Sequence, residues 1–201
     1  LAVSETGGGS DVAALKTFAR KDGDDYIIDG EKMWITNAKQ ADFFCTLVNT
    51  SNESPHKNKS LILIPASSAG LTIGDKIEKL GQHTSDTAPI FFDNVRVPQR
   101  YCIGKEGEGF KIQMQHFQEE RIFLSASILI VLEKCISKTI EFCQDRHAFG
   151  KAIIENQSIQ FRLAELQTEV EALRALIYQA CENFILGKDM TYLASMAKLK
   201  S

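Results

Sequence analysis

The sequence predicts an α+β protein in which an antiparallel β-domain, built as a sandwich or barrel, is followed by a domain of packed helices. Up to Pro98 the apolar residues come in short, often alternating runs that Gly, Asp, Asn and Pro interrupt, which is typical of strands. From Phe110 onward they recur every three or four positions, as in the helices of a bundle. Because the period changes near residue 105, we expect a β-domain over residues 1–104 and a helical domain over residues 105–201.

Short runs of strand-forming residues define the expected strands of the β-domain. They cover residues 26–28, 43–48, 60–65, 71–73 and 90–92. Asp22-Gly23-Asp24 and Asp29-Gly30 are Asp-Gly signals that favour positive φ, so we expect each of them to turn the chain between consecutive antiparallel strands. The polar stretch 49–59, centred on Ser54-Pro55, is typical of a solvent loop.

The only tryptophan of the chain, Trp34, follows the second of these signals in the run Met33-Trp34-Ile35-Thr36. Because side chains alternate along a strand, Trp34 and Thr36 are expected to share one face, while Met33 and Ile35 take the other. One face then offers an aromatic plane beside a hydroxyl group. Taken alone, however, a tryptophan in a strand more often fills the core of its domain.

The helical half predicts two long helices and the start of a third. The first covers residues 110 to about 145, residues 146–157 contain a turn, and the third begins near Met190. The second helix carries apolar residues at alternating steps of four and three: Ile159, Leu163, Leu166, Val170, Leu173, Ile177, Ala180 and Phe184. This spacing is typical of a bundle seam, and Gly187 then ends the helix as a C′ glycine.

Composition excludes several other classes of protein. The 201 residues are 44% hydrophobic with a net charge of −3, and no basic cluster has the density of a nucleic-acid footprint. The longest apolar run, residues 122–132, is far shorter than the roughly 20 residues of a transmembrane helix. Five scattered cysteines without a Cys-x-x-Cys pair indicate neither a disulfide framework nor a zinc site, and the four scattered histidines give no metal signal.

Several motifs, taken in order, make the chain resemble the acyl-CoA dehydrogenase family. They are residues 3–12 (VSETGGGSDV), 29–36 (DGEKMWIT), 81–87 (GQHTSDT), 92–98 (FDNVRVP), 107–110 (GEGF), Glu120-Arg121, 146–151 (RHAFGK), and Gln157 with 163–166 (LAEL). The resemblance extends through almost the whole chain. It implies the flavin-binding middle domain followed by the start of the C-terminal four-helix domain. The family's N-terminal helical domain and last bundle helices are not matched, so the chain is expected to be a fragment that is inactive by itself.

The resemblance implies FAD as cofactor and an acyl-CoA as substrate. The expected reaction is α,β-dehydrogenation of the thioester to a trans-2-enoyl-CoA, in fatty-acid β-oxidation or branched-chain amino-acid catabolism. It also implies electron-transfer flavoprotein as electron acceptor and a homo-oligomer, dimer or tetramer, formed through the helical bundle. The expected location is the mitochondrial matrix in a eukaryote or the cytoplasm in a bacterium. An acyl-CoA oxidase-like flavoprotein and a catalytically silent fragment or isoform remain alternatives.

The resemblance also assigns cofactor contacts in the β-domain. Trp34 is expected to cover the isoalloxazine ring, with Thr36 near its N5 edge and Ile35 between them. Backbone and hydroxyl contacts are expected from a first strand with Leu1, Val3 and Ser4, and from the loop that ends at Ser10, which also lies toward the CoA. The glycines of that loop fit neither the dinucleotide fingerprint nor a P-loop. A close approach of backbone to ligand is the expected role of residues 7–9.

A second group of cofactor contacts is implied in the turn between the long helices. Arg146, Phe149 and Gln157 are expected to reach the pyrophosphate and adenine side of the FAD of a neighbouring subunit. Arg146 suits this role because a planar guanidinium pairs with phosphate oxygens in a fixed geometry. His147 stands where the family more usually has Lys or another polar residue.

Glu120 is the expected catalytic base. Family members carry this carboxylate either on the first helix of the C-terminal domain, immediately before an arginine, or near the far C-terminus. Glu120-Arg121 matches the first arrangement, that of the long-chain and isovaleryl members, and both residues are expected to contact substrate, with Arg121 as a positioning cation. Such a base needs a water-poor pocket in which burial raises its pKa. On its own, Glu-Glu-Arg on a helix is typical of a solvated patch.

Overall fold

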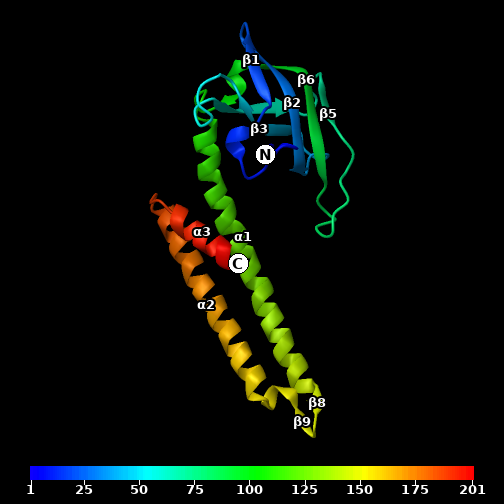
Figure 1. The fold of residues 1–201 in the computed structure, drawn as a ribbon, viewed down its shortest axis with the longest axis vertical. Coiled ribbons are helices and arrows are strands. Elements are labelled where there is room, and N and C mark those ends of the chain that lie inside the picture. The colour runs from blue at the N-terminus through cyan, green and yellow to red at the C-terminus, as the bar shows by residue number, and fades with distance from the viewer. The chain divides into compact units, whose positions relative to one another are not determined.

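The computed structural model describes residues 1–201 and divides into two compact units, Leu1–Gln113 and Met114–Ser201, which are described separately. The first unit is built from strands (Figure 1). In chain order its elements are η1 (Val12–Ala14), β1 (Phe18–Asp22), β2 (Asp25–Thr36), β3 (Phe43–Asn49), β4 (Lys59–Pro65), β5 (Leu71–Ile73), β6 (Thr87–Pro98), η2 (Gln99–Tyr101) and β7 (Cys102–Ile103). All five predicted strands are present, and β1 and β7 are additional.

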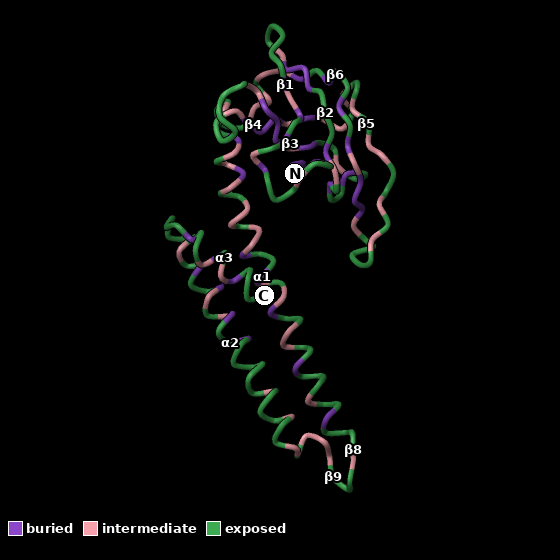
Figure 2. Tube along the Cα trace, in the orientation of Figure 1, coloured by how far each residue is buried: buried purple, intermediate pink, exposed green.

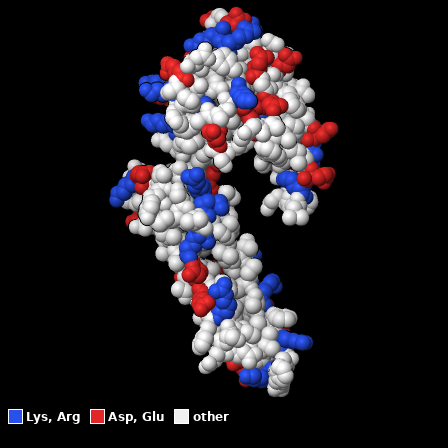
Figure 3. Space-filling view, viewed as in Figure 1, with Lys and Arg blue, Asp and Glu red and all other residues white.

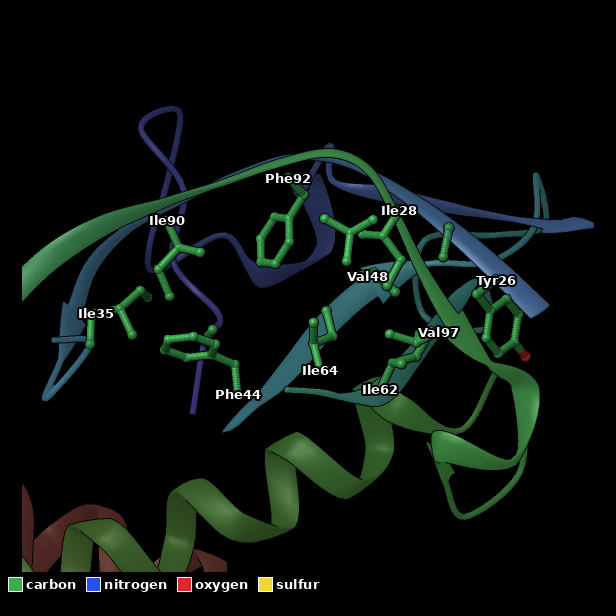
Figure 4. Packing of buried hydrophobic residues seen from close by; sticks show 14 of the residues in the cluster. Tyr26, Ile28, Ile35, Phe44, Val48, Ile62, Ile64, Ile90, Phe92 and Val97 are labelled. Carbon is green, nitrogen blue, oxygen red and sulfur yellow. The ribbon is translucent and has the colours of Figure 1, made fainter. Parts of the chain in front are cut away.

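The strands form one sheet in the order β5-β6-β2-β1-β3-β4-β7. Five of its six strand pairs are antiparallel, as predicted, and the sixth is a single parallel pairing of Phe18 with Asn49 between β1 and β3. Figure 4 shows how the sheet folds onto itself: Ile90 and Phe92 of β6 face Phe44 of β3 and the isoleucines of β4. The enclosed apolar side chains form the core, which confirms the sandwich-like β-domain.

One predicted turn is wrong. Gly23 turns the chain between β1 and β2 with φ +61°, but Asp29-Gly30 lies inside β2, where the register against β6 shifts between Ile28 and Gly30. Gly30 has φ +139°, and a Cβ there would stand 2.8 Å from Thr17 Cα. The glycine therefore serves a β-bulge that presses β2 against the Thr17 backbone. Glycine adopts positive φ both in turns and in β-bulges, so an Asp-Gly pair in the sequence does not by itself distinguish a turn from a bulge.

The expected first strand is also shorter than predicted. Only Ala2 forms a bridge, parallel to Thr46, with its amide donating to Cys45 O over 2.8 Å and its carbonyl accepting from Leu47 N over 3.0 Å. This edge of β3 is free to bond Ala2 because β1 pairs with β3 only at the end of the strand, at Asn49. Beyond Ala2 the chain leaves β3 and reaches β2.

The second unit consists of helices. Helix α1 (Gly109–Asp145) begins in the first unit and continues through the second, where it is followed by β8 (His147–Ala148), β9 (Lys151–Ala152), η3 (Ile153–Glu155), α2 (Gln157–Ile185) and α3 (Thr191–Lys200). These elements match the predicted helices and the turn between them. The expected C′ glycine is confirmed, because Gly187 has φ +66° and its amide donates to Phe184 O over 3.0 Å.

Only the middle of the predicted seam on α2 is buried. Val170, Leu173, Ile177 and Ala180 pack in a cluster with side chains of α1 and α3. Leu166 and Phe184 are exposed by 37% and 52%, and Figure 2 shows that most of the helical surface is exposed. Helix α3 is only ten residues long, so it covers one part of the stripe. None of the helices is long and apolar enough to span a membrane.

Candidate functional site

Trp34 is not a core residue. Its side chain is 51% exposed, whereas Ile35 is 3% exposed and packs in the core. Trp34 lies where the register between β2 and β6 shifts for a second time, between Lys32 and Ile35, and its φ is +60°. A bulky aromatic residue rarely adopts this left-handed conformation, which costs of the order of 1–3 kcal/mol. It persists only where the surrounding structure enforces it. The strand therefore holds an indole on the surface at a conformational cost.

The N-terminal segment lies directly beside this indole. Met33 N donates to Ser4 O over 2.8 Å, which places Ser4 against the residue before Trp34. Val3 is buried and its carbonyl accepts a hydrogen bond from the buried Lys32 ammonium, whereas Leu1 is 43% exposed. The structure thus bonds Ser4 to Met33, the residue before Trp34, and it leaves Thr36 exposed two residues beyond Trp34 on the strand.

The glycine-rich loop closes into a tight turn. Glu5 and Gly8 exchange two backbone hydrogen bonds of 3.1 and 3.0 Å, and a Cβ on Gly9 would stand 3.3 Å from Ser4 Oγ. A Cβ on Gly7 would meet no atom within 4 Å. A cavity of about 390 Å³ adjoins the turn, with Thr6, Gly7, Asp11 and Glu31 in its lining and without Trp34. Ser10 lies exposed just beyond the turn.

A buried ion pair, not expected from the sequence, lies beneath this loop. Lys32 is fully buried, and its Nζ lies 2.9 Å from Glu5 Oε1. Burial lowers the pKa of Lys32 to about 8 although Glu5 opposes the shift. Burial also acts to raise the pKa of Glu5, but the Lys32 charge and hydrogen bonds from Thr17 and Lys16 outweigh it and hold that pKa below its usual value. No local signal in the sequence predicts this pair, because Lys32 follows Glu31 and Glu5 lies between Ser4 and Thr6.

Asp86 fixes the turn that follows Thr36. Its carboxylate accepts hydrogen bonds of 2.8 Å from Lys39 N and from Gln40 Nε2, and its backbone carbonyl accepts one of 2.8 Å from Asn37 N. Desolvation acts to raise the pKa of Asp86, but these hydrogen bonds lower it overall. The end of β2 is therefore anchored on both sides of the exposed indole.

In the helical unit, Glu120 and Arg121 lie on α1 but do not bond to each other. The Glu120 side chain is 43% exposed, and its Oε1 lies 3.4 Å from Nε2 of His116, one turn earlier. Arg121 Nη1 instead donates to Gln118 Oε1 over 2.9 Å. The residues of this unit therefore do not by themselves give Glu120 the water-poor surroundings expected of a base. His116 was not singled out from the sequence, although its four-residue spacing from Glu120 predicts the contact.

Arg146, Phe149 and Gln157 lie on the connection between α1 and α2. Arg146 is anchored by its backbone, which donates to Phe142 O over 2.9 Å and accepts from Ile153 N over 2.8 Å. Phe149 is fully exposed with φ +52°, and Gln157 is the exposed first residue of α2. Asp145, the last residue of α1, is 25 positions after Glu120, about 37 Å along a helix that rises 1.5 Å per residue.

Backbone strain coincides with the predicted cofactor contacts. Five residues other than glycine have positive φ: Trp34, Asn37, Gln82, Asn94 and Phe149. Asparagine tolerates this conformation well, but aromatic residues do not. The two aromatic members, Trp34 and Phe149, both expose their rings and were both predicted to contact FAD.

The remaining charged residues form no further site of this kind. No group of three His, Cys, Asp or Glu side chains is placed to hold a metal ion. On the face drawn in Figure 3, basic and acidic side chains are interspersed over the strands.

Comparison with known families gives two matches that together cover almost the whole chain. Residues 1–95 match the acyl-CoA dehydrogenase middle domain, and residues 107–201 match the acyl-CoA dehydrogenase C-terminal domain. A similar protein is the mitochondrial short/branched chain specific acyl-CoA dehydrogenase of Bos taurus, 38% identical over 198 residues. These residues are 98% of this chain and 46% of that relative, so the chain spans about half the length of the relatives it matches.

Solved structures resemble both units. An acyl-CoA dehydrogenase from Geobacillus kaustophilus matches with a TM-score of 0.91 and 38% identity, over 98% of this chain and 52% of that one. The prolyl acyl carrier protein oxidase AnaB matches with a TM-score of 0.94 and 29% identity, over 99% of this chain and 53% of that one. The fold is thus shared by proteins with more than one described activity.

Proposed function

Because the chain belongs to the acyl-CoA dehydrogenase family, we propose that it forms the flavin-binding and base-carrying part of an FAD-dependent acyl-CoA dehydrogenase. Members of this family are FAD-dependent oxidoreductases that act on the CH-CH group of their donors. The proposed reaction converts an acyl-CoA to its trans-2-enoyl-CoA.

The observation that carries this proposal is Trp34. Trp34 exposes its indole while its backbone is held at φ +60°, next to the residue that bonds Ser4 O, and strained residues of this kind concentrate at functional sites. The exposed ring offers its face to a flat apolar ligand. The isoalloxazine ring has this shape, and it also needs polar contacts along its edge. Ser4 and Thr36 would supply such contacts on either side of the indole. Leu1, Val3 and Ile35 would contribute through their backbones, and Ser10 would reach both cofactor and substrate.

The proposed chemistry divides between cofactor and chain. Bound FAD would supply the hydride acceptor for the β hydrogen of the acyl group. Glu120 removes the α proton with its carboxylate, and Arg121 orients the neighbouring charge. Because the Glu120 side chain is 43% exposed, the active enzyme must exclude water from it when substrate binds.

The position of Arg146 supports an oligomer. About 37 Å of helix lies between Glu120 and the end of α1, which is farther than one FAD molecule reaches. Arg146, Phe149 and Gln157 therefore serve the pyrophosphate and adenine of a flavin bound to a neighbouring subunit. We propose a dimer or tetramer assembled through the helical bundle, whose apolar surface is partly exposed in this chain.

The finer assignments are part of the same proposal. Fatty or branched-chain acyl-CoA is the proposed substrate, and electron-transfer flavoprotein is the proposed acceptor. Relatives include a mitochondrial enzyme and a bacterial one, in keeping with the matrix in a eukaryote or the cytoplasm in a bacterium. Residues 1–104 and 105–201 are proposed as the corresponding domains.

An oxidase is the second candidate, favoured by the high structural similarity to AnaB. The two candidates differ in how the reduced flavin is reoxidised. The test is to purify the full-length protein, record its visible spectrum, reduce it with acyl-CoA without oxygen, and then add either oxygen or electron-transfer flavoprotein. A dehydrogenase is reoxidised much faster by the flavoprotein, an oxidase by oxygen. A protein that neither contains FAD nor binds added FAD would refute both candidates.

A further inference from the structure

We infer that Lys32 is a positioning residue of the flavin site: its buried ammonium holds residues 3–5 against the strand that carries Trp34. This inference rests on the proposed function, because it concerns the binding of the same flavin. Lys32 touches no cofactor in this role and acts through the backbone of the N-terminal segment.

The contacts of Lys32 all lead to that segment. Its Nζ donates to Val3 O over 3.0 Å and to Glu5 Oε1 over 2.9 Å. The carbonyl of Ser4, between these two residues, accepts from Met33 N over 2.8 Å. Three consecutive residues, 3–5, are thus tied to two consecutive residues of β2 immediately before Trp34. These three residues belong to the N-terminal segment 1–10 that is proposed to contact the flavin, called here the proposed flavin loop.

Glu5 connects the ammonium to a third part of the chain. Its carboxylate also accepts hydrogen bonds of 2.7 Å from Lys16 N and 3.0 Å from Thr17 N. Thr17 is the residue against which the Gly30 bulge packs. One carboxylate and one ammonium therefore fix the loop, the segment before β1 and the bulged strand relative to one another.

Stability alone does not account for a fully buried ammonium at this position. Desolvating a charge costs several kcal/mol, and well-packed apolar residues often replace a buried ion pair without loss of stability. The lowered pKa of Lys32 reflects the same cost. Lys32 donates a directed hydrogen bond to Val3 O, which an apolar residue at this position could not make. The geometry of the loop depends on that bond, and small displacements at a binding site are expensive.

Lys59 offers a matched control. It is also fully buried, and its Nζ donates to Ala13 O, Pro55 O and Asn58 Oδ1 over 2.7, 3.0 and 3.0 Å. It therefore joins η1 to the loop before β4 and, although its charge is felt by Glu5, it makes no hydrogen bond to residues 3–5. Loss of either ammonium removes a buried charge and its hydrogen bonds, but only Lys32 is tied to the proposed flavin loop.

The experiment compares variants of the full-length protein. Lys32→Met with Glu5→Gln removes both charges, so that no unpaired charge remains buried, and Glu5→Gln alone keeps the ammonium but weakens its partner. Lys59→Met is the control. Thermal unfolding followed by circular dichroism identifies a temperature at which all the variants are folded. FAD is then titrated into the apoproteins, and the visible spectrum of the bound flavin is recorded.

We expect the double variant to bind FAD about tenfold or more weakly and to shift the visible spectrum of the bound flavin, with a smaller loss for Glu5→Gln. Lys59→Met should lower stability and leave both the affinity and the spectrum unchanged. Wild-type affinity and spectrum in the folded double variant would overturn the positioning role, as would an equal loss in Lys59→Met. Failure of the wild-type protein to bind FAD would instead refute the proposed function.

Discussion

At the scale of single residues, the proposed flavin site rests on two properties of Trp34. Exposure of one aromatic side chain is common and carries little information. Left-handed backbone at the same residue is uncommon, and here the two coincide. A strained residue persists where its surroundings enforce it, and such residues concentrate at functional sites.

Trp34→Gly tests this interpretation, since glycine adopts positive φ without strain. We expect the unfolding free energy of the apoprotein to stay within about 1 kcal/mol of wild type, because released strain offsets the entropy that glycine loses. FAD affinity should fall about tenfold or more, because the flat apolar contact is gone. Asn37→Gly, at φ +59°, is the matched control and should bind FAD normally. Normal FAD binding by Trp34→Gly would show that the indole is not part of the site.

The Glu5 carboxylate predicts a pH dependence of stability. Its pKa is lower in the folded protein than in the unfolded chain, so below about pH 4.5 the unfolded chain binds a proton that the folded protein excludes. The stabilisation from Glu5 is therefore present above that pH and is lost as the pH falls through the folded pKa. We expect urea unfolding from pH 6 to pH 3 to show that the difference in unfolding free energy between wild type and Glu5→Gln becomes smaller in acid.

The exposed Glu53 provides the control for this measurement. Glu53→Gln removes a carboxylate from the polar loop before β4 and should leave the pH dependence of wild type unchanged. The opposite result is a difference in unfolding free energy between wild type and Glu5→Gln that stays constant down to pH 3. That result would mean that the folded protein does not depress the Glu5 pKa.

At the scale of elements, strand β2 carries most of the site. Two bulges interrupt its pairing with β6. The first brings the strand against Thr17, and the second presents Trp34. A regular strand with this sequence would have paired with β6 throughout and would not have held Trp34 in this conformation.

Gly30→Ala tests the first bulge. An added Cβ would stand 2.8 Å from both Thr17 Cα and Thr17 Oγ1, at φ +139°, so backbone must move to admit it. We expect a loss of about 2–4 kcal/mol in unfolding free energy, measured by urea denaturation. Gly7→Ala adds the same methyl group in open space and should change stability by less than about 1 kcal/mol. Equal stability of the two variants would contradict the bulge.

The elements were predictable from the sequence to different degrees. The long helices and the C′ glycine followed from local period and backbone chemistry, as did strands β2 to β6, whereas β1 and β7 were not predicted. The bulge at Gly30 did not, because pairing with β6 decides between a bulge and a turn and lies about 60 residues away in the sequence. The Lys32–Glu5 pair depends on packing of distant segments for the same reason. Leu166 and Phe184 fit the seam by their spacing, but a side chain is buried only where another helix packs against that part of α2.

At the scale of the whole molecule, the length of α1 predicts sites shared between subunits. About 37 Å of helix separates Glu120 from the end of α1, where Arg146 follows, so we propose that these two residues of one chain serve different flavins. Glu120→Gln and Arg146→Ala subunits should each be inactive as homo-oligomers, yet they should complement each other when mixed. In a statistical mixture of dimers, one site of each hybrid is intact, which gives about a quarter of the wild-type activity. Activity that stayed at the level of the separate variants after subunit exchange would place both residues at one site of the same chain.

The central claim is that this chain binds FAD at Trp34 and removes the substrate α proton with Glu120. Its most direct test is an anaerobic titration with acyl-CoA, in which the visible absorbance of full-length wild type and Glu120→Gln is followed side by side. Both proteins should be yellow with equal FAD content, and only the wild type should be bleached, because the variant keeps its flavin but has no base. Bleaching of the variant at the wild-type rate would assign the base to another residue, and a colourless wild type that binds no added FAD would contradict the claim altogether.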